Sequence, residues 1–149
     1  MKKSVISFIS FFAIAIIVFA FQSFSNKQSK EPWTENQLMP ASELAKIIDN
    51  GKPETYIFNV GPAGLIKNAI KIGNGNDKNN IAKLKNEVSK LPEDASIVIY
   101  CGCCPFGDCP NIRPAFSLLN KMKFTNHKLL NLPKNLKVDW LDKGYPMND

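Results

Sequence analysis

Four short apolar runs mark the part of the chain after residue 50. They lie at residues 56–60, 69–72, 96–100 and 127–132, and polar stretches rich in Gly, Pro, Asn or Lys separate them. Continuous apolar runs between turn signals are typical of strands that are buried on both faces. The pattern therefore predicts four strands, of which residues 96–100, with the sequence Ser-Ile-Val-Ile-Tyr, give the clearest signal.

Apolar residues at helical spacing connect these runs. They are found at residues 42–50, 81–91, 112–122 and 138–141. We expect Ser42 to cap the first helix and Gly51 to follow its end, because serine favours the N-cap and glycine the left-handed position after a helix. Asn111 is the expected cap of the third helix.

The alternation of strands and helices indicates a single α/β domain over residues 38–147. We expect a central, mostly parallel sheet with helices on both faces. Functional sites of such sheets lie at the carboxyl ends of the strands. The segment Cys101-Gly-Cys-Cys-Pro-Phe-Gly-Asp-Cys109, called the Cys loop below, follows directly after the clearest strand.

Residues 1–24 have the pattern of a leader. Two lysines precede an uncharged stretch rich in Ile, Ala and Phe, and residues 18–20 offer a small-residue cleavage site. A secretory signal peptide has this form, and an uncleaved anchor stays open because roughly 20 apolar residues can span a bilayer. Both interpretations place the domain outside the cytoplasm, in the periplasm of a bacterium with an outer membrane. Contact with the membrane is expected only if the leader is not cleaved.

The segment at residues 25–37 is polar and is interpreted as a linker, in which Trp33 is taken as incidental. The net charge is +6, but the basic residues are scattered, so we expect no nucleic-acid partner. Eighteen of the nineteen basic residues are lysines, and the single arginine, Arg113, follows shortly after the Cys loop. The planar donors of arginine suit oxyanions better than a lysine ammonium does.

Several segments together resemble the rhodanese homology domain. Ile97-Val-Ile-Tyr-Cys101 is similar to that family's strand leading into its nucleophilic cysteine. Arg113-Pro-Ala115 stands where the family has a loop-closing arginine and small helix residues. The other similar segments are residues 56–61, 64–72 and 124–132, Trp140, and residues 144–146.

The resemblance implies a rhodanese-like fold and sulfur transfer through a cysteine at a strand end. In that chemistry a low-pKa thiolate accepts sulfane sulfur from a small anion such as thiosulfate and yields it to a nucleophile such as a thiol. The sequence departs from the family at Asn59 and Gly61, which replace an Asp and an Arg. Eleven residues separate Cys101 from Arg113, which is more than in the family's usual loop.

Cys101 is the expected nucleophile because it directly follows the strand. Backbone N–H groups and the next helix N-terminus would lower its pKa and hold an anion, with Arg113 nearby. Cys109 is the second candidate, since it is the cysteine closest to the helix start. Cys103, Cys104 and Cys109 are candidates to resolve a persulfide or to form a disulfide, which an oxidising compartment favours.

Two interpretations without catalysis stay open. Four thiols within nine residues can hold a soft metal such as Cu(I) or Zn²⁺, although the spacing C-x-C-C-x4-C is not that of a zinc finger. Disulfides can instead staple the loop for partner recognition. We assign no cofactor and no resident metal, and we expect a small sulfur-containing anion or a thiol acceptor as the partner.

Two further residues are assigned structural roles. His127, the only histidine, begins the strand predicted at residues 127–132 and is expected to be hydrogen bonded rather than catalytic. A single histidine also disfavours a Cys–His protease. Trp140 is expected in the core.

Overall fold

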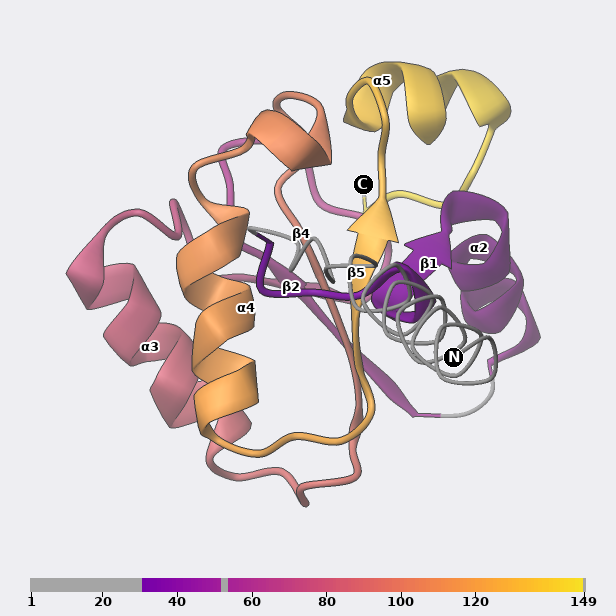
Figure 1. Cartoon of the computed structure of the whole chain (residues 1–149). Helices are drawn as coiled ribbons and strands as arrows, with labels where there is room; N and C mark the ends of the chain where they lie inside the picture. Colours follow the sequence, from indigo (N-terminus) through magenta and orange to yellow (C-terminus); the bar gives the residue numbers. More distant parts are fainter. Residues whose placement is uncertain (1–30, 52–53, 149) are drawn as a thin grey trace, which may run out of the picture. The chain divides into compact units, whose positions relative to one another are not determined.

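The computed structural model describes residues 31–51 and 54–148 (Figure 1). The leader expected at residues 1–24 and the first part of the expected linker, residues 25–30, lie outside the described residues. Among the helices of the described ranges, none is long and apolar enough to cross a membrane.

The described residues form an α/β domain around a five-stranded sheet with the strand order β1-β5-β4-β2-β3. Every strand pairing in it is parallel. The central strand β4 coincides with the run predicted at residues 96–100, and the three other predicted strands are confirmed within one residue at each end. The strands are β1 (Leu38–Pro40), β2 (Thr55–Asn59), β3 (Ala69–Lys71), β4 (Ser96–Tyr100) and β5 (His127–Asn131).

Helices cover both faces of the sheet, as the sequence predicts. Figure 1 shows α3 and α4 side by side on one face and α2 on the other. The α-helices are α2 (Ala41–Asn50), α3 (Lys78–Val88), α4 (Ile112–Lys121) and α5 (Leu136–Asp139). Three short 3-10 turns complete the domain, at η1 (Glu35–Gln37), η2 (Phe106–Asp108) and η3 (Leu141–Lys143).

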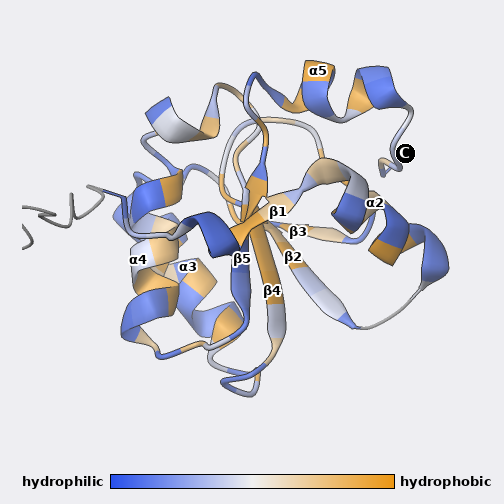
Figure 2. Ribbon diagram, turned by 45° about the vertical axis from the view of Figure 1, so that its right-hand side comes forward, coloured by the Kyte–Doolittle hydropathy of each residue, from blue (hydrophilic) through white to orange (hydrophobic). Residues whose placement is uncertain are grey.

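The core consists of two apolar clusters, one on each face of the sheet. Figure 2 shows hydrophobic residues concentrated in the central strands and hydrophilic residues on the outer surfaces of the helices. A fully buried Leu, Ile or Phe side chain stabilises the fold by about 1.5–3 kcal/mol. The first cluster includes Phe58, Ile72, Leu84, Ile97, Ile99, Ile112, Phe116, Leu119 and Phe124. The second includes Met39, Leu44, Ile57, Ile66, Val98, Tyr100, Leu130 and Trp140.

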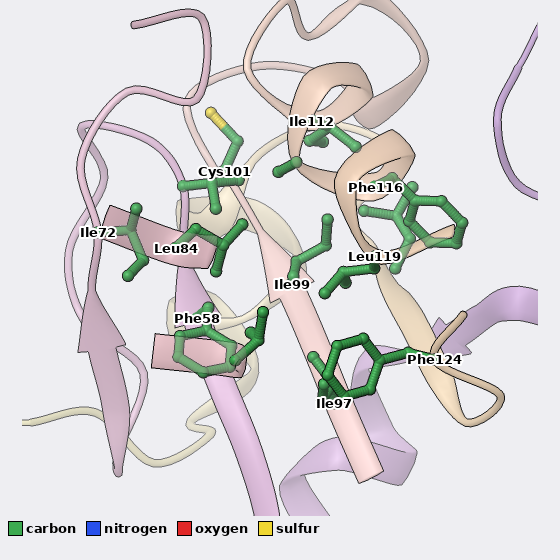
Figure 3. Packing of buried hydrophobic residues seen from close by; sticks show 14 of the residues in the cluster. Phe58, Ile72, Leu84, Ile97, Ile99, Cys101, Ile112, Phe116, Leu119 and Phe124 are labelled. Carbon is green, nitrogen blue, oxygen red and sulfur yellow. The ribbon is translucent and has the colours of Figure 1, made fainter. Parts of the chain in front are cut away.

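Side chains along β4 alternate between these clusters, because successive residues of a strand point to opposite faces. Ile97 and Ile99 belong to the first cluster and Val98 to the second. The alternation continues past the strand end, so that Tyr100 packs in the second cluster and Cys101 in the first. Figure 3 shows Cys101 at the end of this row, with its sulfur beyond the apolar side chains.

One predicted helix cap was wrong and one was confirmed. Ser42 does not cap α2, because the helix begins at Ala41 and Pro40 occupies the N-cap position. Gly51 does end this helix in the left-handed conformation, as expected, with φ of 61°.

Trp33 is not incidental. Its side chain is buried and makes edge-on ring contacts with Phe106 and Phe116, at centroid distances of 6.3 and 5.7 Å. The polar stretch around Trp33 predicts a linker. The burial of Trp33 was missed because it depends on partners more than 70 positions away in the sequence. Trp33 and η1 therefore pack on the domain although they precede residue 38.

Candidate functional site

Cys101 lies at the carboxyl end of the central strand and is 1% exposed. Its sulfur is 3.4 Å from Nδ2 of Asn111, which donates to it, and 3.2 Å from the sulfur of Cys103. Asn111 was predicted as a helix cap. It does occupy the N-cap position of α4, but its side chain makes no capping bond. The amide instead joins Cys101 to the neighbouring loop, since Oδ1 accepts from the N–H of Asn76.

Two positions next to Cys101 are packed so closely that only glycine fits there. A Cβ atom at Gly61 would lie 2.2 Å from the sulfur of Cys101 and 2.7 Å from its carbonyl oxygen. Gly102 has φ of 79°, a conformation that other residues rarely adopt, and a Cβ atom there would lie 2.9 Å from Cβ of Leu136. The absence of a side chain at Gly61 therefore makes room for the sulfur of Cys101.

Hydrogen bonds hold the pKa of the Cys101 thiol at about 5, well below its ordinary value. The largest cause is a hydrogen bond from the Cys109 thiol. Burial opposes this effect, and donors from Asn111 and Cys103 add to it. Hydrogen bonds to the charged form of a group favour that form, so this arrangement stabilises a thiolate on Cys101.

The other cysteines differ from Cys101 in protonation and exposure. The hydrogen bond to Cys101 raises the pKa of Cys109, which is buried. Desolvation and the neighbouring sulfurs raise the pKa of Cys103 to about 12. Cys103 is exposed and Cys104 half-buried, and all four cysteines are free thiols in this structure. Within the cluster, the arrangement therefore favours the thiolate form of Cys101, to which the thiols of Cys109 and Cys103 donate hydrogen bonds.

The sulfurs of Cys101, Cys103 and Cys109 all lie within 4.8 Å of one another. Cysteine thiolates are soft ligands that suit Cu(I) and Zn²⁺. This group of sulfurs has dimensions that a soft cation could bridge. Cys104 is outside it, although its sulfur lies 3.2 Å from that of Cys103.

Arg113 braces the far end of the Cys loop. Its guanidinium donates to the carbonyl oxygens of Gly107 and Cys109 and pairs with the Glu31 carboxylate at 2.7 Å. It also lies over the ring of Trp33, 5.7 Å from the ring centroid. In the described part of the chain, no contact joins Arg113 to Cys101, so its role in this structure is to hold the loop backbone.

The structure thus brings together the four cysteines predicted for the site and places Arg113 beside them as a brace. Sequence reasoning missed the contacts of Gly61, Asn111 and Glu31. Gly61 carried a signal, since it departs from the family pattern directly beside the strand end. Glu31 carried none, because it pairs with a residue 82 positions away.

The structural roles expected of two further residues are confirmed. His127 is buried, with Nδ1 lying 2.9 Å from the Phe124 carbonyl and Nε2 2.8 Å from Oδ1 of Asn120. Burial lowers its pKa, so the ring is neutral at neutral pH. Trp140 is fully buried, and its indole N–H donates to the carbonyl of Pro146.

Comparison with known proteins identifies the fold as rhodanese-like. The solution NMR structure of a rhodanese-like domain from an Anabaena protein matches with a TM-score of 0.53 and 20% identity, over 75% of this chain and 78% of that one. No protein-family model and no curated protein matches the chain. The rhodanese-like fold expected from the sequence is therefore confirmed, and at this identity the match shows the fold alone.

Proposed function

We propose that this protein is an extracytoplasmic sulfurtransferase or persulfide carrier of the rhodanese type, with Cys101 as the nucleophile. One observation carries the proposal: a buried cysteine at the carboxyl end of the central strand accepts a hydrogen bond from Asn111 and has the sulfurs of Cys103 and Cys109 within 4.8 Å. The thiolate is the reactive form of cysteine, and such donors increase its population. The rhodanese-like fold supports the same assignment.

The reaction that fits this site is a two-step transfer. The Cys101 thiolate attacks the outer sulfur of a thiosulfate-like anion, so that a persulfide forms on Cys101 and sulfite leaves. A nucleophile then takes the outer sulfur, and Cys101 returns as a thiolate. With cyanide as the acceptor the product is thiocyanate, and with a thiol it is a persulfide of that thiol. Neither step needs an oxidant or a cofactor.

The surrounding residues have distinct parts in this proposal. Asn111 and Cys109 stabilise the thiolate in the resting state and again when it leaves the persulfide. Arg113 acts as a positioning residue, because its donors hold the loop carbonyls of Gly107 and Cys109. The expected partners are a small sulfur-containing anion and a thiol acceptor. The export proposal depends on the leader pattern at residues 1–24.

The test is sulfur transfer from thiosulfate to cyanide by the reduced domain, compared with Cys101→Ser. Removing the nucleophile should lower the rate at least about 100-fold, as expected for loss of a covalent intermediate. Cys104→Ser is the matched control and should retain the rate. Activity that persists in Cys101→Ser and disappears in Cys109→Ser would move the nucleophile to Cys109.

Intact mass with and without reductant complements this assay. A mass increase of one sulfur atom that cyanide removes would support the proposal. Stoichiometric Cu or Zn without any sulfane sulfur would instead favour the soft-metal module that the sequence left open.

A further inference from the structure

We propose that Cys103 is a relay cysteine. It accepts the sulfane sulfur from buried Cys101 and transfers it to acceptors too large to reach Cys101. This inference rests on the function proposed above and names the route by which sulfur leaves that site. The observations that carry it are the contrast in exposure between the two cysteines and the short distance between their sulfurs.

Burial limits what can reach Cys101. The residue is 1% exposed, with Gly61 packed against its sulfur on one side and Asn111 on another. A thiol acceptor of peptide size cannot bring its sulfur to an atom enclosed in this way. Cys103 lies two residues further along the chain on the solvent side, and its residue is exposed.

The turn at Gly102 brings the two sulfurs together. Its left-handed backbone folds the chain back, so that the Cys103 sulfur lies 3.2 Å from the Cys101 sulfur. A sulfane sulfur on Cys101 would extend about 2 Å beyond Sγ, which is the length of a sulfur–sulfur bond. The outer atom would therefore lie close to Cys103, and rotation of the exposed Cys103 side chain can bring its sulfur in line with that atom without any movement of the strand.

The step is an exchange within the loop. The Cys103 sulfur attacks the outer sulfur of the Cys101 persulfide, a new sulfur–sulfur bond forms on Cys103, and the bond on Cys101 breaks. Cys101 leaves as a thiolate, and the proton of the Cys103 thiol passes to the transferred sulfur. Charge and electrons balance, with one persulfide and one negative charge before and after.

The environment favours this direction of transfer. Thiol exchange is faster when the leaving sulfur has a low pKa. Hydrogen bonds hold the pKa of Cys101 well below that of Cys103, which is raised by desolvation and by the neighbouring sulfurs. Cys101 is thus the better leaving group of the pair.

The other two cysteines fit this role less well. Cys109 is fully buried, and its thiol is the main hydrogen-bond donor to Cys101. Cys104 is half-buried and lies outside the group of three sulfurs that includes Cys101. Cys104 is therefore the matched control, since it neighbours Cys103 in the same loop.

The test compares a small and a large acceptor for sulfur loaded from thiosulfate. With Cys103→Ser, kcat/KM for transfer to glutathione should fall at least about tenfold more than kcat/KM for transfer to cyanide. Cys104→Ser should leave both unchanged. An equal loss of kcat/KM with the two acceptors, or no loss with either, would overturn the relay role of Cys103.

Peptide mapping after alkylation of the loaded protein gives a second measurement. Persulfide should be found on both Cys101 and Cys103 in the unaltered protein and on Cys101 alone in Cys103→Ser. Release of sulfide together with a Cys101–Cys103 disulfide would show that Cys103 attacks the inner sulfur of the persulfide, and this result would overturn the relay role of Cys103. Absence of sulfane sulfur from every cysteine of the unaltered protein would overturn the proposed function together with the relay role of Cys103.

Discussion

Tyr100 and Cys101 are neighbours at the end of the same strand, both are buried, and they point to opposite faces of the sheet. The hydroxyl of Tyr100 donates to the Gly64 carbonyl and accepts from the Ile66 N–H, each at 3.0 Å. The sulfur of Cys101 accepts weak hydrogen bonds from donors that stabilise its anion. One face of the strand end therefore fixes the loop after β2, while the other face surrounds the Cys101 sulfur with hydrogen-bond donors.

The largest effect is expected from crowding the reactive face with Gly61→Ala. The added Cβ would meet the Cys101 carbonyl as well as its sulfur, so a side-chain rotation cannot relieve the overlap. Overpacking of this kind costs about 1–3 kcal/mol of stability. A displacement of the nucleophile by about 1 Å can cost a factor of about 100 in rate. Denaturant unfolding and thiosulfate turnover measure the two effects.

Gly107→Ala is the matched control for this prediction, because a Cβ atom at Gly107 in the Cys loop meets nothing within 4 Å. Its stability and rate should be close to those of the unaltered protein. A Gly61→Ala protein with full activity would show that Cys101 needs no close packing at this glycine, and the contrast between the two faces would weaken.

Tyr100→Phe should affect the structural face alone. It leaves the buried N–H of Ile66 without this acceptor, at a cost of about 1–3 kcal/mol, whereas the carbonyl of exposed Gly64 keeps the Asn59 amide as a donor. Because the hydroxyl has no contact with the sulfur cluster, the transfer rate should change by less than about threefold. Unfolding free energy and turnover, measured on the same preparation, test this separation. A large loss of rate in a stable, folded variant would show that the two faces are coupled.

The smallest effect is expected from Asn111→Ala, which removes one donor to the thiolate. Donors favour the charged form, so their removal should raise the pKa of Cys101 from about 5 towards its ordinary value. One hydrogen bond of about 1 kcal/mol corresponds to a rise of about 0.7 pH units. The profile of Cys101 alkylation against pH, followed by peptide mapping of the reduced protein and of its Asn111→Ala form, should therefore move to higher pH. A shift to lower pH, or none, would exclude Asn111 as a donor to the thiolate.

Sequence patterns predicted the reactive strand end more fully than its surroundings. The run at residues 96–100 is apolar throughout and is followed at once by glycine and cysteines, so the position of Cys101 followed from local signals. The hydrogen bond from Asn111 to the Cys101 sulfur did not follow from local signals. Whether the Asn111 side chain caps the helix or binds the sulfur depends on where the loop at Asn76 lies. The ion pair between Glu31 and Arg113 depends on tertiary packing in the same way.

The contacts that Glu31 and Trp33 make with Arg113 also determine how far the chain can be shortened with its Cys loop held in place. A chain shortened to begin at residue 38 would keep every strand of the sheet. It would lose the carboxylate of Glu31 and the indole of Trp33, which contact the arginine that holds the Cys loop. The seven residues at 31–37 thus belong with the Cys loop by contact, although they precede the sheet in the chain.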